Sequence, residues 1–376
     1  MTRKLGAKRK PLMHFVGEID DPRTPSNGKL HDFEEILVIS VCAMISGAES
    51  FEDIALWGTV KQAWLKRFLV LKNGIPSHDT FDRVFRLLDP KQFEQTFRRW
   101  TRHVVTALGG QVAIDGKTLR GSADDGPPVH MVSAFATDVG IVLGQEKVAD
   151  KSNEITAIPV LLEALYLKGM LVSIDAMGCQ KQIAATITAM GGDYLLAVKG
   201  NQASLLSRLE AALAGPIDAP VFKDLITGHG RVVAQFARTL PADGIVDPAL
   251  WSNCASIGRI DTLRVVNGKP SDLEQRYYIS SRALTADELA RAARAHWAIE
   301  NQLHWVLDVT FGEDASQVRK DHAAQNLSLL KKIVLTILRT DTTDNAKTSL
   351  RQKLKRAGWD DNLRMGMLGI QLKSSS

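Results

Sequence analysis

Hydrophobic positions in the first hundred residues recur at helical spacing. Asp32 precedes an apolar stretch that ends at Gly47, and Glu35 stands three residues after Asp32, the pattern of a capped helix start. Asp89-Pro90 opens a later helix, because proline is accepted at a first helical position. Other helices are expected over residues 50–57, 60–70 and 78–88. The pattern predicts a helical N-terminal domain over 29–107, preceded by a basic flexible N-terminus over 1–28.

After Gly109-Gly110 the pattern changes to short β-type runs separated by polar or glycine-containing turns. Three strands come first and are followed by alternating helices and strands. The expected strands are 112–115, 132–137, 141–145, 170–175 and 194–198, with helices at 153–167 and 179–190. This order predicts an α/β (α+β) fold, a mixed sheet with helices on its faces.

Residues 201–284 alternate again in short runs punctuated by glycine, which predicts a β-rich insertion lying outside the central sheet. A long helix then starts at Thr285, where Thr285 and Glu288 form a capping box. We therefore divide the rest of the chain into a catalytic domain over 108–200 and 285–345 and a basic C-terminal tail over 346–376.

Charge and cysteine content narrow the class of protein. Lysine and arginine exceed aspartate and glutamate by 47 − 42 = 5, which permits a polyanionic partner without requiring one. Three separated cysteines fit a reducing cytoplasm. The longest apolar run, 36–45, is too short to span a bilayer, so we expect a cytoplasmic protein without membrane contact. Basic clusters at both ends are either solubilising tails or DNA contacts: Arg3, Lys4, Lys8, Arg9, Lys10, Arg351, Lys353, Lys355 and Arg356.

Two buried-type strands each end in an aspartate. Val112-Ala-Ile runs into Asp115, and Val172-Ser-Ile runs into Asp175. A carboxylate at the end of an apolar strand is costly unless it is paired or holds a cation, although such an aspartate also commonly caps the next turn. Two on adjacent strands would favour a cation, and oxygen ligands suit Mg²⁺ or Mn²⁺.

A third carboxylate, Glu300, lies in a helical segment with an apolar stripe. Residues three and four apart share a helix face, so Glu300 lies beside His296 and His304. Zinc binding by the histidines is less favoured, because the spacing is not His-Glu-x-x-His. The imidazoles either lie near phosphate or are hydrogen-bonded in a packed interface. Trp297 and Trp305 are expected to be core aromatics rather than base-stacking surfaces.

Four motifs together resemble the ISAs1 family of insertion-sequence transposases, which is related to the IS4-type DDE enzymes. The resemblance extends from Phe33 through Val309-Thr-Phe-Gly-Glu-Asp314. The motifs are Val-Ala-Ile-Asp115-Gly-Lys-Thr-Leu-Arg120-Gly-Ser, Ile-Asp175-Ala-Met, Tyr-Leu-Leu-Ala-Val-Lys199-Gly-Asn-Gln and Arg294-x-His-Trp-x-Ile-Glu300-Asn-x-Leu-His-Trp.

The resemblance implies a ribonuclease-H-like fold in which Asp115, Asp175 and Glu300 are the catalytic, metal-binding triad. It implies two Mg²⁺ (or Mn²⁺) ions, about 3.5–4 Å apart in such sites. The implied partners are double-stranded DNA, as the terminal inverted repeats of the element and as target DNA, and a second copy of the chain in a homodimer on DNA. The implied location is the bacterial nucleoid. The insertion between Asp175 and Glu300 spans 300 − 175 = 125 positions, as in IS4-type enzymes.

Two parts of the sequence depart from the wider IS4 pattern. Ala293, His296 and Leu307 stand where Tyr, Arg and Lys are usual, and Val232-Val233 follows His229-Gly-Arg231 where an acidic residue is usual.

Basic and imidazole side chains near the predicted triad are candidate DNA contacts, with solvated loop residues as the alternative. They are Lys117, Arg120, Lys181, Lys199, Arg294, His296 and His304. Two other functions stay open: a catalytically decayed transposase that only binds DNA, and a ribonuclease-H-like nuclease that cuts without strand transfer.

Overall fold

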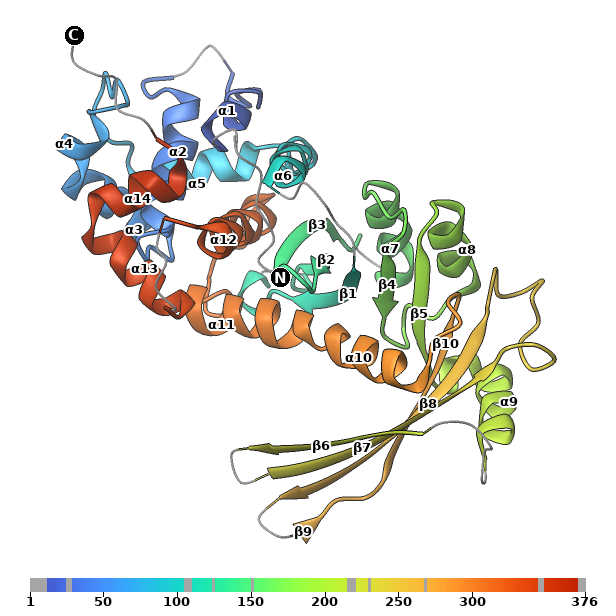
Figure 1. Cartoon of the computed structure of the whole chain (residues 1–376). Helices are drawn as coiled ribbons and strands as arrows, with labels where there is room; N and C mark the ends of the chain where they lie inside the picture. The colour runs from blue at the N-terminus through green and yellow to red at the C-terminus, as the bar shows by residue number, and fades with distance from the viewer. Residues whose placement is uncertain are drawn as a thin grey trace.

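The computed structural model of the chain describes residues 12–24, 29–104, 110–123, 126–149, 152–214, 221–228, 231–266, 269–343 and 348–370 (Figure 1). Most of the basic stretch over 1–28 lies outside these residues, as do His229 and Gly230 of the sequence motif. The part of 1–28 that is described contains a short helix, α1 (Leu12–Val16), in which Phe15 and Val16 are buried.

The N-terminal part is helical, as the hydrophobic spacing predicts. Asp32 caps α2 by accepting a hydrogen bond from the Glu35 backbone N–H at 3.0 Å, and Ser50 and Asp53 form a capping box at the start of α3. The helices here are α2 (Phe33–Met44), α3 (Phe51–Val60), α4 (Gln62–Leu65), α5 (His78–Leu87) and α6 (Pro90–Val104).

Three C-terminal helices return to this part of the molecule. They are α12 (Ala323–Thr340), α13 (Leu350–Trp359) and α14 (Asp361–Leu368). Nearly every residue of α12 is buried, because the helix contacts α2 and α5 as well as strand β3 (Ile141–Lys147). The description of 346–376 as a basic tail is therefore wrong for 350–368. Leu354, Ala357 and Met365 are buried against the same core. Arg351 and Lys355 are exposed, whereas Arg364 is fully buried.

The central sheet begins with an antiparallel meander and continues with parallel strands. Its strands are β1 (Gln111–Thr118), β2 (His130–Ala136), β3, β4 (Leu171–Ile174) and β5 (Asp193–Val198). They are ordered β3-β2-β1-β4-β5, with β4 parallel to both β1 and β5. Helices α7 (Glu154–Glu163) and α8 (Lys181–Ala189) cover one face, and α10 (Ala286–His296) and α12 cover the other (Figure 1). The predicted mixed sheet with helices on its faces is confirmed.

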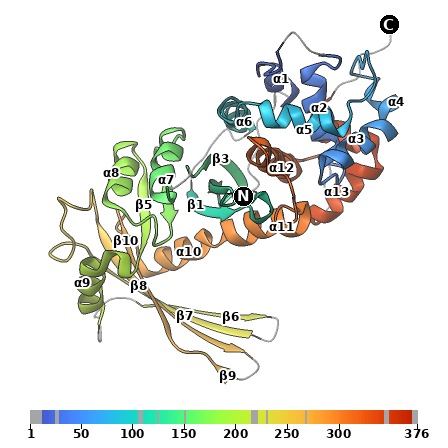
Figure 2. The same ribbon diagram turned by 180° about the vertical axis from the view of Figure 1, so that it is seen from behind.

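The segment predicted as a β-rich insertion contains one helix and five strands. They are α9 (Ala203–Leu213), β6 (Phe222–Gly228), β7 (Arg231–Pro241), β8 (Ser256–Val266), β9 (Lys269–Pro270) and β10 (Glu274–Ser280). The expectation that this segment lies outside the central sheet is wrong, because β10 pairs with β5 and β8 pairs with β10. The sheet thus continues through β10-β8-β7-β6, and the far ends of these strands extend away from the helices (Figures 1 and 2). Among the described residues, no helix has the length and hydropathy required to cross a membrane.

Candidate active site

Neighbouring strands bring the two predicted aspartates to one edge of the sheet. In the parallel pair β1 and β4, Ile114 lies opposite Ile174, so Asp115 and Asp175 each follow a paired isoleucine. Successive strand residues point to opposite faces. Ile114 packs with the α7 and α8 core, whereas Ala113 packs with the α12 core. Asp115 therefore points to the face covered by α10 and α12.

Glu300 reaches this face from an interrupted helix. The capping box of Thr285 and Glu288 starts α10 as predicted, but the helix changes to a π-helix, η3 (Ile299–His304), before α11 (Trp305–Phe311). Such π-helical turns are rare in proteins, and those that occur are often at functional sites. Arg339 on α12 donates a hydrogen bond to the Gln302 backbone carbonyl and so holds this turn against the core. Helical spacing in the sequence did not reveal the change of helix type.

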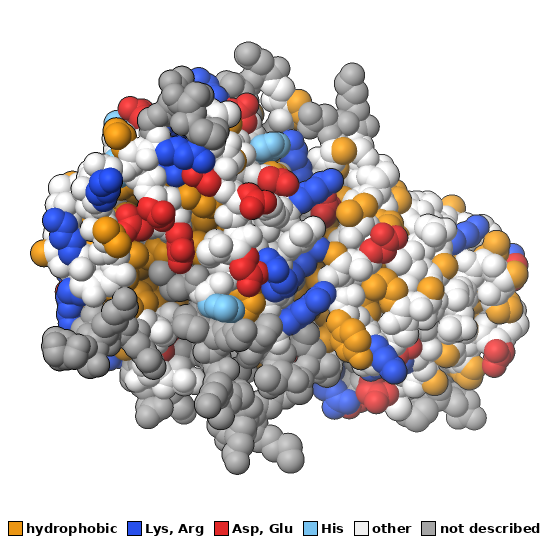
Figure 3. Space-filling view, turned by 90° about the horizontal axis from the view of Figure 1, so that it is seen from above, with side chains coloured by type: hydrophobic (Ala, Val, Ile, Leu, Met, Phe, Trp, Pro, Cys, Tyr) orange, Lys and Arg blue, Asp and Glu red, His pale blue; other side chains and the backbone are white. Residues whose placement is uncertain are grey.

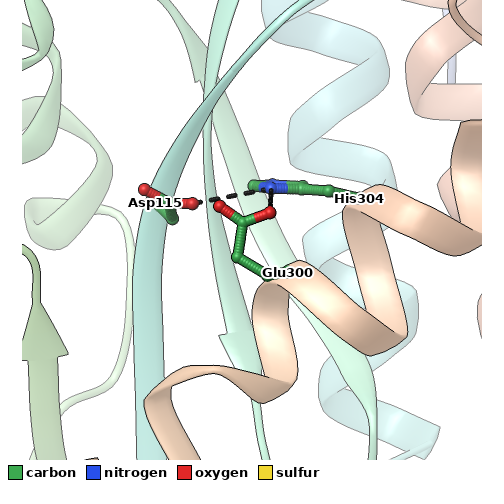
Figure 4. Close-up of side chains that lie close together, drawn as sticks. All are labelled: Asp115, Glu300 and His304. Atoms are coloured by element: carbon green, nitrogen blue, oxygen red, sulfur yellow. Dashed lines mark hydrogen bonds and ion pairs between the residues drawn. The ribbon is translucent and has the colours of Figure 1, made fainter. Parts of the chain in front are cut away.

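Asp115, Glu300 and His304 form a compact group (Figure 4). The His304 Nδ1 atom lies 3.5 Å from Asp115 Oδ2 and 3.4 Å from Glu300 Oε2. Each residue offers one ligand atom, and these atoms lie within 4.8 Å of one another. His304 is buried, and its Nε2 atom has no hydrogen-bond partner among the described residues.

The electrostatics of the group favour a bound cation. The pKa of Asp115 is raised to about 8, first by burial and then by the hydrogen bond and charge of Glu300 and the charge of Asp175. The pKa of Glu300 is lowered to about 2, mainly because His304 hydrogen-bonds its carboxylate. Without a cation, burial and the neighbouring carboxylates therefore favour the protonated form of Asp115. Two carboxylates and one imidazole are a donor set that fits a divalent metal ion.

Asp175 stands beside this group but outside it. Its Oδ1 atom accepts hydrogen bonds from the backbone N–H groups of Met177, at 3.0 Å, and Gly178, at 3.3 Å. Asp175 therefore caps the turn after β4, which was the alternative considered from the sequence. Its charge still acts on the site, since it contributes to the raised pKa of Asp115.

His296 is held in a packed interface. The side chain is partly buried, and Nδ1 lies 3.1 Å from the Ser173 hydroxyl on β4. Burial lowers the pKa of His296, so the ring is neutral at physiological pH. His304 is more deeply buried than His296.

Sequence reasoning missed a carboxylate on the other face of β1. Glu154, the first residue of α7, lies with Oε1 2.7 Å from His130 Nε2, and His130 Nδ1 lies 2.8 Å from the Thr118 hydroxyl. Its charge also raises the pKa of Asp115. The only sequence signal is Gly116 directly after Asp115, because a side chain there would occupy the space of Glu154.

Replacing Gly116 by alanine is expected to displace the Glu154 and His130 side chains and to lower stability by about 1 kcal/mol, the usual contribution of a hydrogen bond such as theirs. The new Cβ would lie 2.1 Å from Glu154 Oε1 and 2.6 Å from His130 Nε2. Gly200→Ala is the matched control, because no atom of the described residues lies within 4 Å of its Cβ position. Urea unfolding measures both variants, and equal midpoints would contradict this explanation of Gly116.

The predicted DNA-contacting basic residues fall into two groups. Lys181 and Lys199 are exposed beside the carboxyl ends of β4 and β5, and Arg120 is exposed while lying 3.4 Å from Asp314. Lys117 and Arg294 are engaged within the protein. Lys117 is surrounded by carboxylates, and Arg294 contacts Asp224 and Gln235 of the long strands.

Two tryptophans near Glu300 are exposed, contrary to their interpretation as core aromatics. Trp297 is 44% and Trp305 is 59% exposed. The helix turns them to the side opposite the buried Ile299 and Leu303, and Arg276 stacks on the Trp297 ring at 4.8 Å.

Comparison with known proteins defines the class as DNA transposases with a DDE catalytic domain. Residues 108–337 match the family model described as Transposase DDE domain, and residues 13–101 match the model described as DDE_Tnp_1-associated. The chain belongs to the Transposase DDE domain family. The resemblance to insertion-sequence transposases of the IS4 type is thereby confirmed.

Named relatives cover nearly the whole chain. The H repeat-associated putative transposase YhhI of Escherichia coli (strain K12) is 38% identical over 366 residues, 94% of this chain and 96% of that protein. The Putative transposase YncI of Escherichia coli O157:H7 is 40% identical over 361 residues, 92% of this chain and 91% of that protein. A solved piggyBac transposase synaptic complex with hairpin DNA covers 97% of this chain and 79% of its own, at 11% identity and a TM-score of 0.44.

Proposed function

We propose that this transposase cuts phosphodiesters at the ends of an insertion sequence and joins the freed 3′-OH ends to target DNA, using Asp115, Asp175 and Glu300. The observation that carries the proposal is the approach of Glu300 to Asp115, from residues 185 positions apart (300 − 115), at the strand edge where Asp175 also lies. A buried carboxylate whose pKa is raised to about 8 is a group that a bound cation would stabilise.

Asp115 and Glu300 would hold Mg²⁺ or Mn²⁺ together, and Asp175 would complete the set by turning one oxygen from its turn toward them. Two such ions, when bound, supply an activated water and neutralise charge on the leaving 3′ oxygen. His304 orients both carboxylates through its Nδ1 atom. The protein contributes positioning and charge, and no covalent enzyme intermediate is required.

DNA would approach along the edge that carries Asp175. Lys181, Lys199 and Arg120 are exposed there and would contact backbone phosphates, which gives affinity without base specificity. On another face, lysine and arginine side chains gather near the middle with acidic side chains among them (Figure 3). That face therefore has a local basic patch and is not uniformly basic. A homodimer assembled on two element ends is part of the proposal.

The test is a Mg²⁺-dependent assay of the full chain on DNA that carries the element's own terminal inverted repeats beside a target plasmid. We expect nicking at the element ends, followed by joined products that contain target sequence. Nicking without joined products would support the nuclease alternative. Binding without nicking at any Mg²⁺ or Mn²⁺ concentration would support the decayed DNA-binding alternative and contradict the proposed chemistry.

A further inference from the structure

The strand that carries Asp115 contacts the helical segment that carries Glu300 at two places, and the spacing between these contacts is similar along both elements. Two residues along a strand advance about 6.6 Å, and four residues along a helix advance about 6 Å. Asp115 and Lys117 are two apart on β1, and His304 and Asp308 are four apart on η3 and α11. Asp115 meets His304, and Lys117 meets Asp308 at 2.7 Å.

Lys117 makes three ion pairs in a nearly closed environment. Its Nζ atom lies 2.7 Å from Asp308, 3.2 Å from Glu313 and 2.8 Å from Asp314, and its side chain is only 10% exposed. Burial alone would lower the pKa of Lys117, but the three carboxylates raise it. The ammonium group is therefore surrounded by protein carboxylates, and Asp314 accepts a hydrogen bond from it at 2.8 Å.

The sequence motif Val309–Asp314 supplies two of these partners. Gly312 ends α11 in the left-handed conformation, with φ of 58°, and the chain turns back so that the Glu313 N–H donates to the Leu307 carbonyl at 3.0 Å. Glu313 is buried and also accepts a hydrogen bond from Ser328 on α12 at 2.8 Å. The turn thus joins α11, α12 and β1 around one ammonium group.

We propose that Lys117 is a positioning residue whose pairing with Asp308 fixes the helix of Glu300 in register against Asp115, so that the two carboxylates meet at the metal site. This inference rests on the proposed function, because it assigns Lys117 a role toward the same metal site. It replaces the sequence-based expectation that Lys117 contacts DNA.

The test measures Mn²⁺ binding to the full chain without DNA, by electron paramagnetic resonance of free Mn²⁺, for wild type, Lys117→Met and Lys117→Met/Asp308→Asn. We expect about a tenfold or larger loss of Mn²⁺ affinity in both variants, as is usual when a partner that orients metal ligands is removed. Removing one positive charge without any positional effect would instead raise the affinity in Lys117→Met. The double variant has the wild-type net charge, so charge alone would leave its affinity unchanged.

Two further measurements separate positioning from general stability and from DNA contact. Arg259→Met removes a similarly buried ion pair, with Asp261 at 3.0 Å on β8, and should lower the unfolding midpoint without changing Mn²⁺ affinity. The salt dependence of DNA binding should stay unchanged in Lys117→Met, whereas a lost phosphate contact would reduce the slope by about 0.9. Lys199→Met provides the comparison for such a contact.

The outcomes are distinguishable. Wild-type affinity for Mn²⁺ in the folded double variant would overturn the positioning role alone, and so would a reduced salt slope in Lys117→Met. If Lys117→Met does not fold, the double variant still tests the positioning role. Its Asp308→Asn change removes the carboxylate charge that Lys117→Met leaves without a cation, so the double variant is less destabilised. Absence of Mn²⁺ binding in wild type would overturn the proposed function and the positioning role together.

Discussion

Glu300→Gln is expected to lower the rate of Mg²⁺-dependent DNA cleavage by about 10³-fold or more. A carboxylate that holds a catalytic metal ion contributes several kcal/mol to the transition state, and each 1.36 kcal/mol is a factor of ten in rate. The glutamine keeps the size and the contact to His304, and Glu300 is half exposed, so folding should be unaffected. The measurement is single-turnover nicking of DNA carrying the element's ends.

Asp287→Asn is the matched control for this variant. It removes one negative charge from α10, where Asp287 pairs with Arg291 at the surface. Its cleavage rate should match wild type within a factor of two or so, because an exposed ion pair contributes little. Cleavage by Glu300→Gln at the wild-type rate would remove Glu300 from the metal site and leave the proposed chemistry without its third carboxylate.

The sequence predicts the central sheet from local rules, whereas the meeting of Asp115 with Glu300 is predicted from the resemblance to insertion-sequence transposases. Alternating apolar runs specify strands, and capping boxes mark helix starts. Burying an aspartate at the end of an apolar strand is unfavourable unless the carboxylate is paired or binds a cation. These signals lie within a few residues of Asp115, Asp175 and Thr285. The parallel pairing of β1 with β4 then brings both aspartates to one edge.

The features that the sequence does not predict depend on partners distant along the chain. In the sequence, Lys117 looks like a loop lysine. The structure shows that it donates a hydrogen bond to Asp314, 197 positions later in the chain. The pairing of β10 with β5 depends on which sheet edge is free after folding, and strand patterns do not encode that edge. At the π-helical turn that carries Glu300, the Gln302 carbonyl likewise accepts a hydrogen bond from Arg339, 37 positions later in the chain.

The proposed metal ligands are thus identified from nearby sequence patterns, whereas the contacts that hold them in place come from residues distant along the chain. Asp115 and Glu300 would bind the metal ion, whereas Lys117 and Arg339 hold the two segments that carry them. Asp175 differs from both groups, because the structure gives it a local partner in its own turn.

Asp175→Asn is expected to abolish cleavage, by about 10³-fold or more, while folding and DNA binding persist. The asparagine oxygen can accept the same hydrogen bonds from Met177 and Gly178, so the turn after β4 is kept and only the charge is lost. DNA binding should be equal or slightly tighter, because one repelling carboxylate is removed from the phosphate-binding edge. Nicking, DNA binding and urea unfolding are measured in parallel with wild type.

Asp175→Ala separates the charge from the turn cap. Alanine loses both hydrogen bonds, so this variant should unfold more easily, by about 1 kcal/mol as for other lost caps, whereas Asp175→Asn should not. If Asp175 acts through its charge at the metal site, both Asp175→Asn and Asp175→Ala should lose cleavage activity. If Asp175 were only a turn cap, Asp175→Asn would nick DNA at the wild-type rate and only Asp175→Ala would be impaired. The metal site would then rest on Asp115 and Glu300 alone.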